Sequence, residues 1–308
     1  MRIAHLSDLH ISTFLKKGNI GKTKKLLKYA VETGFDHLVI TGDLSDNSEA
    51  KDFVILRKIL ENFNLLDSRK TTIIIGNHDI FGGVQTAIDV VNFPSKCLKT
   101  DFHQKVNDFV SNFKELFDEC YFPIKDSYFP YAKVIGDVVL VGLNTIDYYS
   151  RLKNPFASNG KVGKKQRNGL KEILTNERFN GKRKFIMSHH HFYKNTEQAS
   201  SSSSVWNRIE SYTLKLKGKK KLLKLFSDNN VELVLHGHSH EMRDYIRKGI
   251  RFLNAGGAVD NSLLKSASVI FIDINENIEA AIHSLDLGSK VKPETIYSEI
   301  SEPVLVIN

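Results

Sequence analysis

The sequence predicts a layered α/β fold, in which two β-sheets form a sandwich flanked by helices. Three patterns predict it: apolar runs alternate with amphipathic runs early in the chain, a hairpin pattern lies near the middle, and short strands alternate with turns at the end. The 308 residues suit one large domain. We expect a single domain spanning 1–308, with a mainly helical, cap-like insertion at about 80–130.

The first quarter of the chain has the pattern of a β-α-β-α-β unit. Short apolar runs predict strands over residues 1–7, 37–41 and 71–75, the last of them rich in β-branched residues. Between them, apolar residues recur at helical spacing over 19–33 and 48–62. This alternation implies parallel strands joined by right-handed crossovers.

The segment at about 80–130 has a different composition. It is rich in Phe and Asp and is predicted to be mainly helical, notably over 102–117, so we expect it to cover the site. Two runs, 131–135 and 138–144, are separated by Gly136-Asp137 and give the strongest hairpin signal in the chain.

The remaining elements complete the layers. A basic helix is predicted over 164–175, and strands over 184–188 and 231–235. The serine run at 200–204 is predicted to be a loop, and short strands alternate with turns from Ile250 onward. In α/β folds the loops after the carboxyl ends of strands build the functional site.

Composition limits the function classes. Hydrophobic residues make up 41% and charged residues 26%, which is typical of a soluble globular protein. No apolar run is long enough for a membrane span, and the N-terminus lacks a signal-peptide pattern. Two cysteines, Cys97 and Cys120, are too few for a disulfide framework, so we expect a cytoplasmic protein.

The net charge of +9 favours anionic partners: phosphorylated metabolites, nucleic acids or an anionic lipid surface. Much of the excess is lysine in short clusters, and the cluster at 215–221 is most simply a solvated helix flank.

Five polar clusters follow predicted strands. They are Asp8-Leu9-His10, Gly42-Asp43, Gly76-Asn77-His78-Asp79, His189-His190-His191 and Gly237-His238-Ser239-His240. Residues i and i+2 of an extended segment point to the same side, so Asp8 and His10 are expected to hold one ion together. The same spacing relates His238 and His240. Carboxylate, imidazole and amide ligands without a thiolate suit Mn, Fe or Zn.

Two ions would explain the whole set. Asp43 is placed to bridge them, and ions about 3.5–4 Å apart can clamp a phosphoryl group and activate a water for in-line attack. His78 follows Asn77 directly, and we expect it to act as a general acid on the leaving-group oxygen or to stabilise the charged transition state.

In this order the five clusters resemble the calcineurin-like metallophosphoesterase superfamily, whose pattern is D-x-H, G-D, G-N-H-[DE], H and G-H-x-H. Gly160, Gln166 and Asn254-Ala255-Gly256-Gly257 are similar to its bacterial cyclic-nucleotide and glycerophosphodiester phosphodiesterase branch. The resemblance covers almost the whole chain except 80–130 and 192–225, and it implies the αββα fold of that superfamily.

The resemblance also implies a role for each residue. The first metal ion would be held by Asp8, His10, Asp43 and His240. The second would be held by Asp43, Asn77, His189 and His238. His78 would be the catalytic histidine that binds neither ion.

The sequence departs from the family pattern in two places. The phosphodiesterase branch usually has two prolines after its His-His pair, where this chain has His191-Phe192, so His190 stays open as a ligand in place of His189. The protein Ser/Thr phosphatases have G-D-x-V-D-R-G, and the segment 42–48 lacks that arginine, which disfavours their branch.

Other polar and aromatic residues near the clusters are expected to have supporting roles. His5 lies within a predicted strand, so we expect core packing or support of a ligand. Asp46 and Asp79 are expected to support a loop or a ligand histidine. Tyr148 and Phe81 follow strand-end or motif-bearing segments and are candidates for lining a pocket.

The leading function is metal-dependent hydrolysis of a phosphodiester bond in a small molecule of the cyclic-nucleotide or glycerophosphodiester class. One alternative is a lipid-phosphate or nucleotide-sugar pyrophosphatase at a membrane face, with the leucines and lysines of 215–224 as a surface anchor. Another is a nuclease, which the charge would suit, although the extra segments of the repair-nuclease branch are missing. A metal-bound binding protein without turnover is disfavoured, because the chain keeps every ligand.

Overall fold

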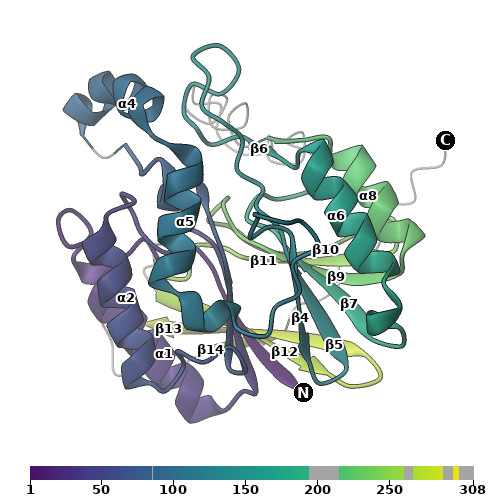
Figure 1. Cartoon of the computed structure of the whole chain (residues 1–308). Coiled ribbons are helices and arrows are strands. Elements are labelled where there is room, and N and C mark those ends of the chain that lie inside the picture. Colours follow the sequence, from purple (N-terminus) through teal and green to yellow (C-terminus); the bar gives the residue numbers. More distant parts are fainter. Residues whose placement is uncertain (85, 194–214, 260–265, 287–293, 298–308) are drawn as a thin grey trace.

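The protein has two six-stranded sheets packed face to face, with helices on their outer sides (Figure 1). This is the predicted fold class. The computed structural model describes residues 1–308 except 85, 194–214, 260–265, 287–293 and 298–308. The predicted serine loop at 200–204 lies outside the described residues.

The first sheet has the strand order β14-β13-β12-β1-β2-β3. Its strands are β1 (Arg2–Leu6), β2 (His37–Thr41), β3 (Thr71–Ile74), β12 (Ser266–Ile274), β13 (Ile278–Asp286) and β14 (Glu294–Tyr297). β1, β2 and β3 are parallel, as predicted, and β1 pairs on its other side with antiparallel β12. The C-terminal strands therefore extend the sheet that the N-terminal unit begins.

The second sheet has the order β10-β11-β9-β7-β5-β4. Its strands are β4 (Tyr131–Ile135), β5 (Val138–Gly142), β7 (Arg183–Met187), β9 (Val231–His236), β10 (Met242–Arg247) and β11 (Ile250–Ala255). β4 and β5 form the predicted hairpin, whereas β5, β7, β9 and β11 are parallel to one another. A short parallel pair, β6 (Gly160–Lys161) and β8 (Leu216–Lys217), stands apart from both sheets.

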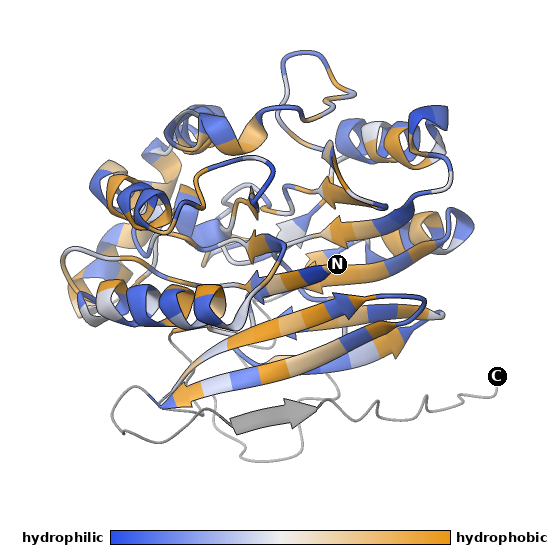
Figure 2. Ribbon diagram, turned by 90° about the horizontal axis from the view of Figure 1, so that it is seen from below, coloured by the Kyte–Doolittle hydropathy of each residue, from blue (hydrophilic) through white to orange (hydrophobic). Residues whose placement is uncertain are grey.

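Amphipathic helices cover the outer faces. α1 (Gly18–Thr33) and α2 (Ala50–Asn62) pack on the first sheet, and α6 (Lys164–Thr175) and α8 (Lys219–Asp228) on the second. Their ribbons mix hydrophilic and hydrophobic residues, while the strands between them contain long hydrophobic stretches (Figure 2). This distribution buries apolar side chains both between the sheets and beneath the helices, which is the main stabilising term of such a fold.

The segment between β3 and β4 is mainly helical. It contains the short helix α3 (Asn77–Ile80), α4 (Ala87–Lys99) and α5 (Phe102–Asn112). The range 102–117 is mainly helical, as predicted, but α5 ends before Phe113 and the 3₁₀ turn Lys114–Phe117 follows. The Phe113 ring leaves the helical path and packs 5.6 Å from the Phe109 ring in the core. That this segment is an inserted cap remains a prediction.

The leucines of 215–224 do not form the surface anchor that the membrane-face alternative requires. Leu216, Leu222 and Leu223 are at most 4% exposed and pack in the core between the second sheet and its helices. The apolar face of α8 is thus used by the fold, and its lysines lie on the outer side together with Ser227 and Asp228. Within the described part of the chain, no helix combines the length and the apolar character needed to cross a bilayer.

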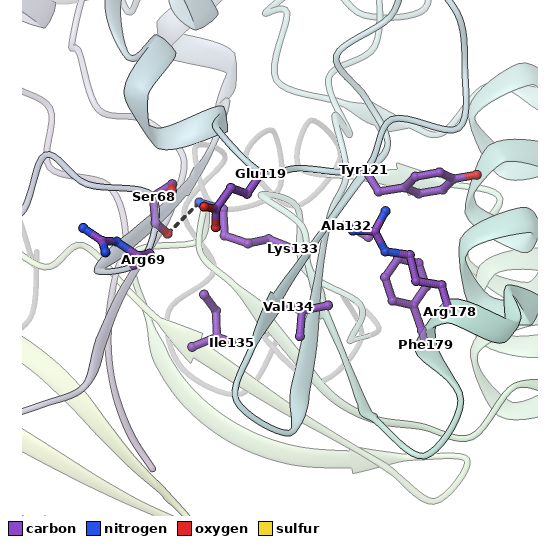
Figure 3. A pocket seen from close by; sticks show the side chains of 10 residues that line it. All are labelled: Ser68, Arg69, Glu119, Tyr121, Ala132, Lys133, Val134, Ile135, Arg178 and Phe179. Atoms are coloured by element: carbon purple, nitrogen blue, oxygen red, sulfur yellow. Dashed lines mark hydrogen bonds between the residues drawn. The ribbon is translucent and has the colours of Figure 1, made fainter.

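A buried lysine joins the edge strand β4 to the first sheet. Lys133 is 3% exposed, and its ammonium group donates hydrogen bonds to the carbonyls of Ser68, Thr71 and Leu116 at 3.1, 3.1 and 2.6 Å. Burial lowers the pKa of Lys133 to about 8. A cavity of about 390 Å³ beside it, shown in Figure 3, lies near the amino end of β3 and away from the predicted ligands. Lys133 is therefore a structural tie.

Candidate metal centre

The predicted ligands converge where parallel strands of both sheets end. Asp8, Asp43 and Asn77 follow β1, β2 and β3 in the first sheet. His189 and His238 follow β7 and β9 in the second. The carboxyl ends of these strands face one another, so residues distant in sequence lie side by side.

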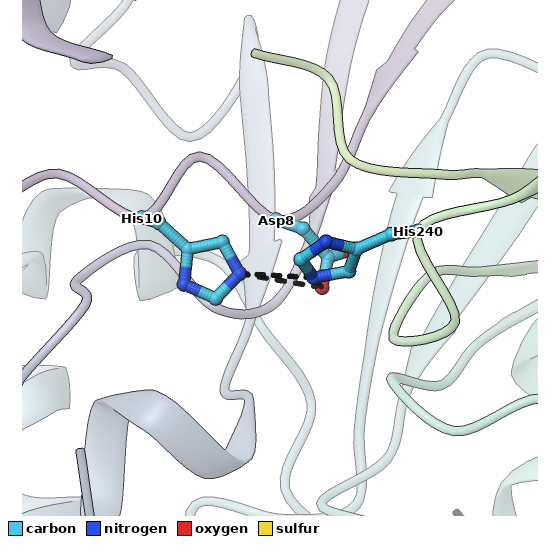
Figure 4. Close-up of side chains that lie close together, drawn as sticks. All are labelled: Asp8, His10 and His240. Carbon is cyan, nitrogen blue, oxygen red and sulfur yellow. Dashed lines mark hydrogen bonds and ion pairs between the residues drawn. The ribbon is translucent and has the colours of Figure 1, made fainter. Parts of the chain in front are cut away.

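Asp8, His10 and His240 form the first group (Figure 4). The Nε2 atoms of His10 and His240 are 3.2 Å apart, and His240 Nε2 lies 3.6 Å from Asp8 Oδ1. Ligand atoms that surround one ion at about 2.1 Å are separated by about 3 Å from each other. The spacing of this group therefore suits a single divalent ion.

Asp43, His189 and His238 form the second group, and Asn77 lies beside it. His189 Nε2 is 3.2 Å from Asp43 Oδ2, 3.1 Å from Asn77 Oδ1 and 3.1 Å from His238 Nδ1. These four side chains again present oxygen and imidazole atoms at the separation expected around one ion.

Asp43 lies between the two groups. Its Oδ2 is 3.2 Å from His189 Nε2 in the second group and 3.9 Å from His10 Nε2 in the first. Its Oδ1 accepts a 2.8 Å hydrogen bond from the backbone N–H of His78. This bond fixes the carboxylate so that one oxygen faces both groups, as a bridging ligand requires.

Backbone carbonyls set the tautomers of two histidines. His189 Nδ1 is 2.8 Å from the carbonyl of Thr41, and His238 Nε2 is 3.0 Å from the carbonyl of Ser158. A carbonyl only accepts, so the proton lies on those nitrogens. His189 Nε2 and His238 Nδ1, the atoms that point into the second group, are then free to bind a metal ion.

The carboxylates of the site are buried, so nearby positive charge is needed to stabilise them. The two carboxylates, Asp8 and Asp43, are at most 1% exposed, and among the described residues Asp8 Oδ1 has no hydrogen-bond donor. Burial alone would raise the pKa of Asp43, but the neighbouring charges of His189, His78 and His10 lower it well below its usual range. Burial lowers the pKa of His189, yet Asp43 outweighs it and raises that pKa to about 9. The residues present thus fit bound cations.

The ligand loops have an unusual backbone. Asp8, His10, Asp43, His238 and His240 have φ angles of 54°, 43°, 51°, 74° and 52°. The extended geometry expected for the D-x-H and H-x-H pairs is therefore wrong. Backbone hydrogen bonds between the first two loops, such as Asp8 N–H to the Gly42 carbonyl at 3.0 Å, hold left-handed conformations that are costly for these residues.

Two glycines leave room for the carboxylates. A Cβ on Gly76 would lie 2.2 Å from Asp43 Oδ1, and one on Gly237 would lie 2.3 Å from Asp8 Oδ2. Neither contact is sterically allowed, so a side chain at either position would displace the carboxylate. The glycines of the G-N-H-D and G-H-S-H clusters are part of the site's geometry.

His78 lies in a third close group, with His10 and Asp46, which overlaps the first group at His10 and does not include Asp8. Its Nδ1 donates to the Asp46 carbonyl at 2.9 Å, and its ring is 4.5 Å from the His10 ring. The His78 side chain is 22% exposed, whereas that of His10, a candidate metal ligand, is only 1% exposed. Burial lowers the pKa of His78 to about 4, although Asp43 acts in the opposite direction. An anionic substrate near Nε2 would favour the protonated ring.

The predicted supporting carboxylates are in place. Asp79 accepts backbone hydrogen bonds from Ser45 and Gly76, both at 2.8 Å, and thereby joins the loops after β2 and β3. Asp46 Oδ1 lies 3.4 Å from His10 Nδ1. Lys16 Nζ lies 3.4 Å from the same oxygen, a contact that the sequence did not predict.

The structure favours His189 over His190 as the ligand. His190 Nδ1 is 2.7 Å from Thr145 Oγ1, and its Nε2 is 3.1 Å from the Ser158 carbonyl, so both ring nitrogens are engaged. His5 is fully buried, with Nε2 3.0 Å from Thr41 Oγ1, which agrees with the supporting role expected for it.

Comparison with known proteins decides the family. The family model described as calcineurin-like phosphoesterase matches residues 1–242. The chain belongs to this calcineurin-like phosphoesterase family. It is a hydrolase of a family that depends on a dinuclear metal centre. The bacterial phosphodiesterase branch within the family is not established by this match.

Solved structures show the same fold at low sequence identity. A dimetal phosphatase from Danio rerio aligns with a TM-score of 0.58 and 11% identity over 96% of this chain and 98% of its own. Purple acid phosphatase PPD1 from yellow lupin (Lupinus luteus) seeds gives 0.57 and 13% over 96% of this chain, which spans only 53% of the lupin protein. GAP50, the anchor in the inner membrane complex of Plasmodium, gives 0.50 and 15% over 98% and 90%. No curated protein matches the sequence.

The structure groups the side chains as the family resemblance implies, and their individual ligand roles remain predictions. The bridging role is the first to test. Asp43→Asn is expected to reduce bound metal below two ions per chain and to lower turnover at least about a hundredfold. The reason is that a neutral amide bridges two cations less well than a carboxylate does. Metal analysis and kcat are the measurements. Asp137→Asn, at a side chain that is 95% exposed in a hairpin turn, is the matched control. Full turnover in a metal-replete Asp43→Asn sample would contradict bridging.

His78 has a different expected signature. His78→Ala should keep both metal ions and lower kcat about a hundredfold or more, the range typical of a lost general acid. His283→Ala, which removes a ring that contacts Tyr29 on the far side of the first sheet, controls for nonspecific effects. If metal content falls with His78→Ala, the residue is a ligand and not the catalytic histidine.

Proposed function

We propose that this calcineurin-like phosphoesterase hydrolyses a phosphodiester bond in a small molecule of the cyclic-nucleotide or glycerophosphodiester class. The observation that supports it best is the position of Asp43, whose Oδ2 faces both ligand groups. When bound, two divalent ions neutralise the phosphoryl oxygens and lower the pKa of a water molecule. Mn, Fe and Zn all accept this ligand set.

The side chains of the protein have separate tasks in this proposal. Asp43, held by the His78 backbone N–H, keeps the two ligand groups at a fixed separation. His78 Nδ1 is used by the Asp46 carbonyl, and among the described residues His78 Nε2 has no hydrogen-bond partner. His78 would give a proton to the leaving oxygen or hydrogen-bond to it as negative charge develops.

Residues shared with the phosphodiesterase branch shape the loops around the centre, which supports the diester proposal. Gln166 bonds both the N–H and the carbonyl of Asn144, at 2.9 and 2.8 Å, and so fixes the loop after β5. Asn254 donates to Ser239 Oγ at 2.6 Å and accepts from the N–H of Gly256 at 3.0 Å. These bonds hold the G-H-S-H loop in position.

Two alternatives use the same centre. A pyrophosphatase acting on lipid phosphates or nucleotide sugars at a membrane face would need a contact surface other than the buried leucines of 215–224. A nuclease would use the net charge of +9, although a nucleic-acid partner is not favoured. A phosphate-ester small molecule is the proposed partner, and a cytoplasmic location remains the expectation.

A substrate screen separates these proposals. The purified chain, loaded in turn with Mn, Fe and Zn, should hydrolyse bis(4-nitrophenyl) phosphate with a kcat/KM at least about tenfold above that for 4-nitrophenyl phosphate, since the proposed site accepts a monoanionic diester. Cyclic nucleotides, glycerophosphodiesters, nucleotide sugars and oligonucleotides complete the panel. Faster hydrolysis of monoesters or pyrophosphates with every metal would contradict the diester proposal.

A further inference from the structure

A cavity of about 240 Å³ lies between α5, the loop after β5 and the start of α6. Its lining residues come from α5 and the segment 124–129, which both precede β4, and from the loop after β5, β6 and the start of α6. The residues that matter for its chemistry are Phe102, His103, Asn144, Tyr148, Lys161 and Lys165. The cavity is smaller than the roughly 300–1,000 Å³ of pockets that enclose drug-sized ligands, so it suits a fragment of a substrate.

Packing contacts link both walls of this cavity to segments that carry residues of the candidate metal centre. On one side Ile146, which lines the cavity, pairs with Gly160, and a Cβ on Gly160 would lie 2.6 Å from the His190 ring. The His190 ring is in turn 4.3 Å from that of His238. Gly160 and His190 thus lie between Ile146 of the cavity and His238 of the second ligand group.

The other wall connects to the catalytic histidine. Phe102 packs 6.1 Å from Phe81, the residue that directly follows α3. α3 carries Asn77 and His78, so the Phe81–Phe102 contact links the wall of the cavity to the segment that carries His78.

An aromatic surface lines the cavity. The rings of Phe102 and Tyr148 are 4.5 Å apart, and the Tyr148 hydroxyl lies 3.2 Å from His103 Nε2. This contact orients the tyrosine ring, which remains 56% exposed. An exposed, oriented ring offers a stacking face to a planar group.

Positive charge lies on the opposite side. Lys161 and Lys165 line the cavity, and both residues are exposed. Lys165 is in the first turn of the 12-residue helix α6, whose N-terminal end carries partial positive charge. One carboxylate, Asp126, also lines the cavity, so the balance of side-chain charge is one positive unit.

We propose that this cavity is a leaving-group subsite for an aromatic group that carries a second anionic charge, the chemistry of a nucleoside monophosphate. This inference rests on the proposed function, because it adds a specificity site to the same centre. The aromatic face of Phe102 and Tyr148 stacks on the base, while Lys161 and Lys165 attract the second phosphate.

Direct binding tests the charge. Adenosine 5′-monophosphate and adenosine are titrated into the Mn-loaded full chain by calorimetry. Lys165→Met and Lys161→Met should each weaken binding of the monophosphate about fivefold and leave binding of adenosine unchanged. Lys171→Met, on the same helix but outside the cavity, should change neither. Equal affinity of Lys165→Met, Lys161→Met and Lys171→Met for the monophosphate overturns the proposal.

The aromatic part has its own pair of variants. Tyr148→Ala should weaken binding of both ligands about tenfold, because the stacking face is lost. Tyr148→Phe keeps the stacking face and loses only the hydroxyl contact with His103, so its affinity for both ligands should fall between those of the unaltered protein and Tyr148→Ala. Failure of the unaltered chain to bind the monophosphate, or unchanged binding by Tyr148→Ala, also overturns the subsite.

A parallel activity measurement separates the two proposals. Turnover of bis(4-nitrophenyl) phosphate by the same samples reports on the proposed function alone. Normal turnover without the expected binding pattern would remove the subsite and leave the diesterase. The expected binding pattern without turnover of any diester would support the subsite and remove the diesterase.

Discussion

The structure depends on the burial of two carboxylates, Asp8 and Asp43, at the meeting edge of the two sheets. An ionised carboxylate in such a place is stable only if positive charge compensates it. The neighbouring histidines respond to these negative charges: Asp43 raises the pKa of His189 to about 9, although burial acts in the opposite direction. Metal cations satisfy the same demand with higher charge, and the spacing of the ligand atoms suits two of them.

The rest of the fold holds the candidate ligand side chains together, despite the repulsion between like charges and the strained backbone of their loops. Parallel strands bring five loops to one edge, and backbone hydrogen bonds join those loops in conformations that single residues avoid. Gly76 and Gly237 let the backbone approach the carboxylates closely. The carbonyls of Thr41 and Ser158 orient the imidazoles, so much of the chemistry is set by main-chain atoms.

The layers, the order of the first strands and helices, and the grouping of the motif residues were predictable, because hydrophobic period and strand-end position are visible in the sequence. Other features were not. A main-chain carbonyl such as that of Ser158 has no sequence signal, and the left-handed φ of Asp8 depends on tertiary hydrogen bonds. Periodicity also missed the break at Phe113, and it could not tell whether the leucines beside the lysines of 215–224 face water or the core.

In our proposal, substrate choice depends on segments outside the five metal-ligand clusters. The aromatic and basic cavity beside the centre belongs to α5, the loop after β5 and α6, where neither spacing nor resemblance predicted a binding site, although Tyr148 was a candidate for lining one. In the proposed account the metal centre sets the reaction class, and this neighbouring surface selects the substrate.

The central claim concerns two ions that share one aspartate. Crystals of the Mn-loaded protein, measured at the manganese absorption edge, test it directly. Two anomalous peaks about 3.5–4 Å apart are predicted, with Asp43 Oδ2 within bonding distance of both. A single peak, or two peaks of which only one contacts Asp43, would contradict the account.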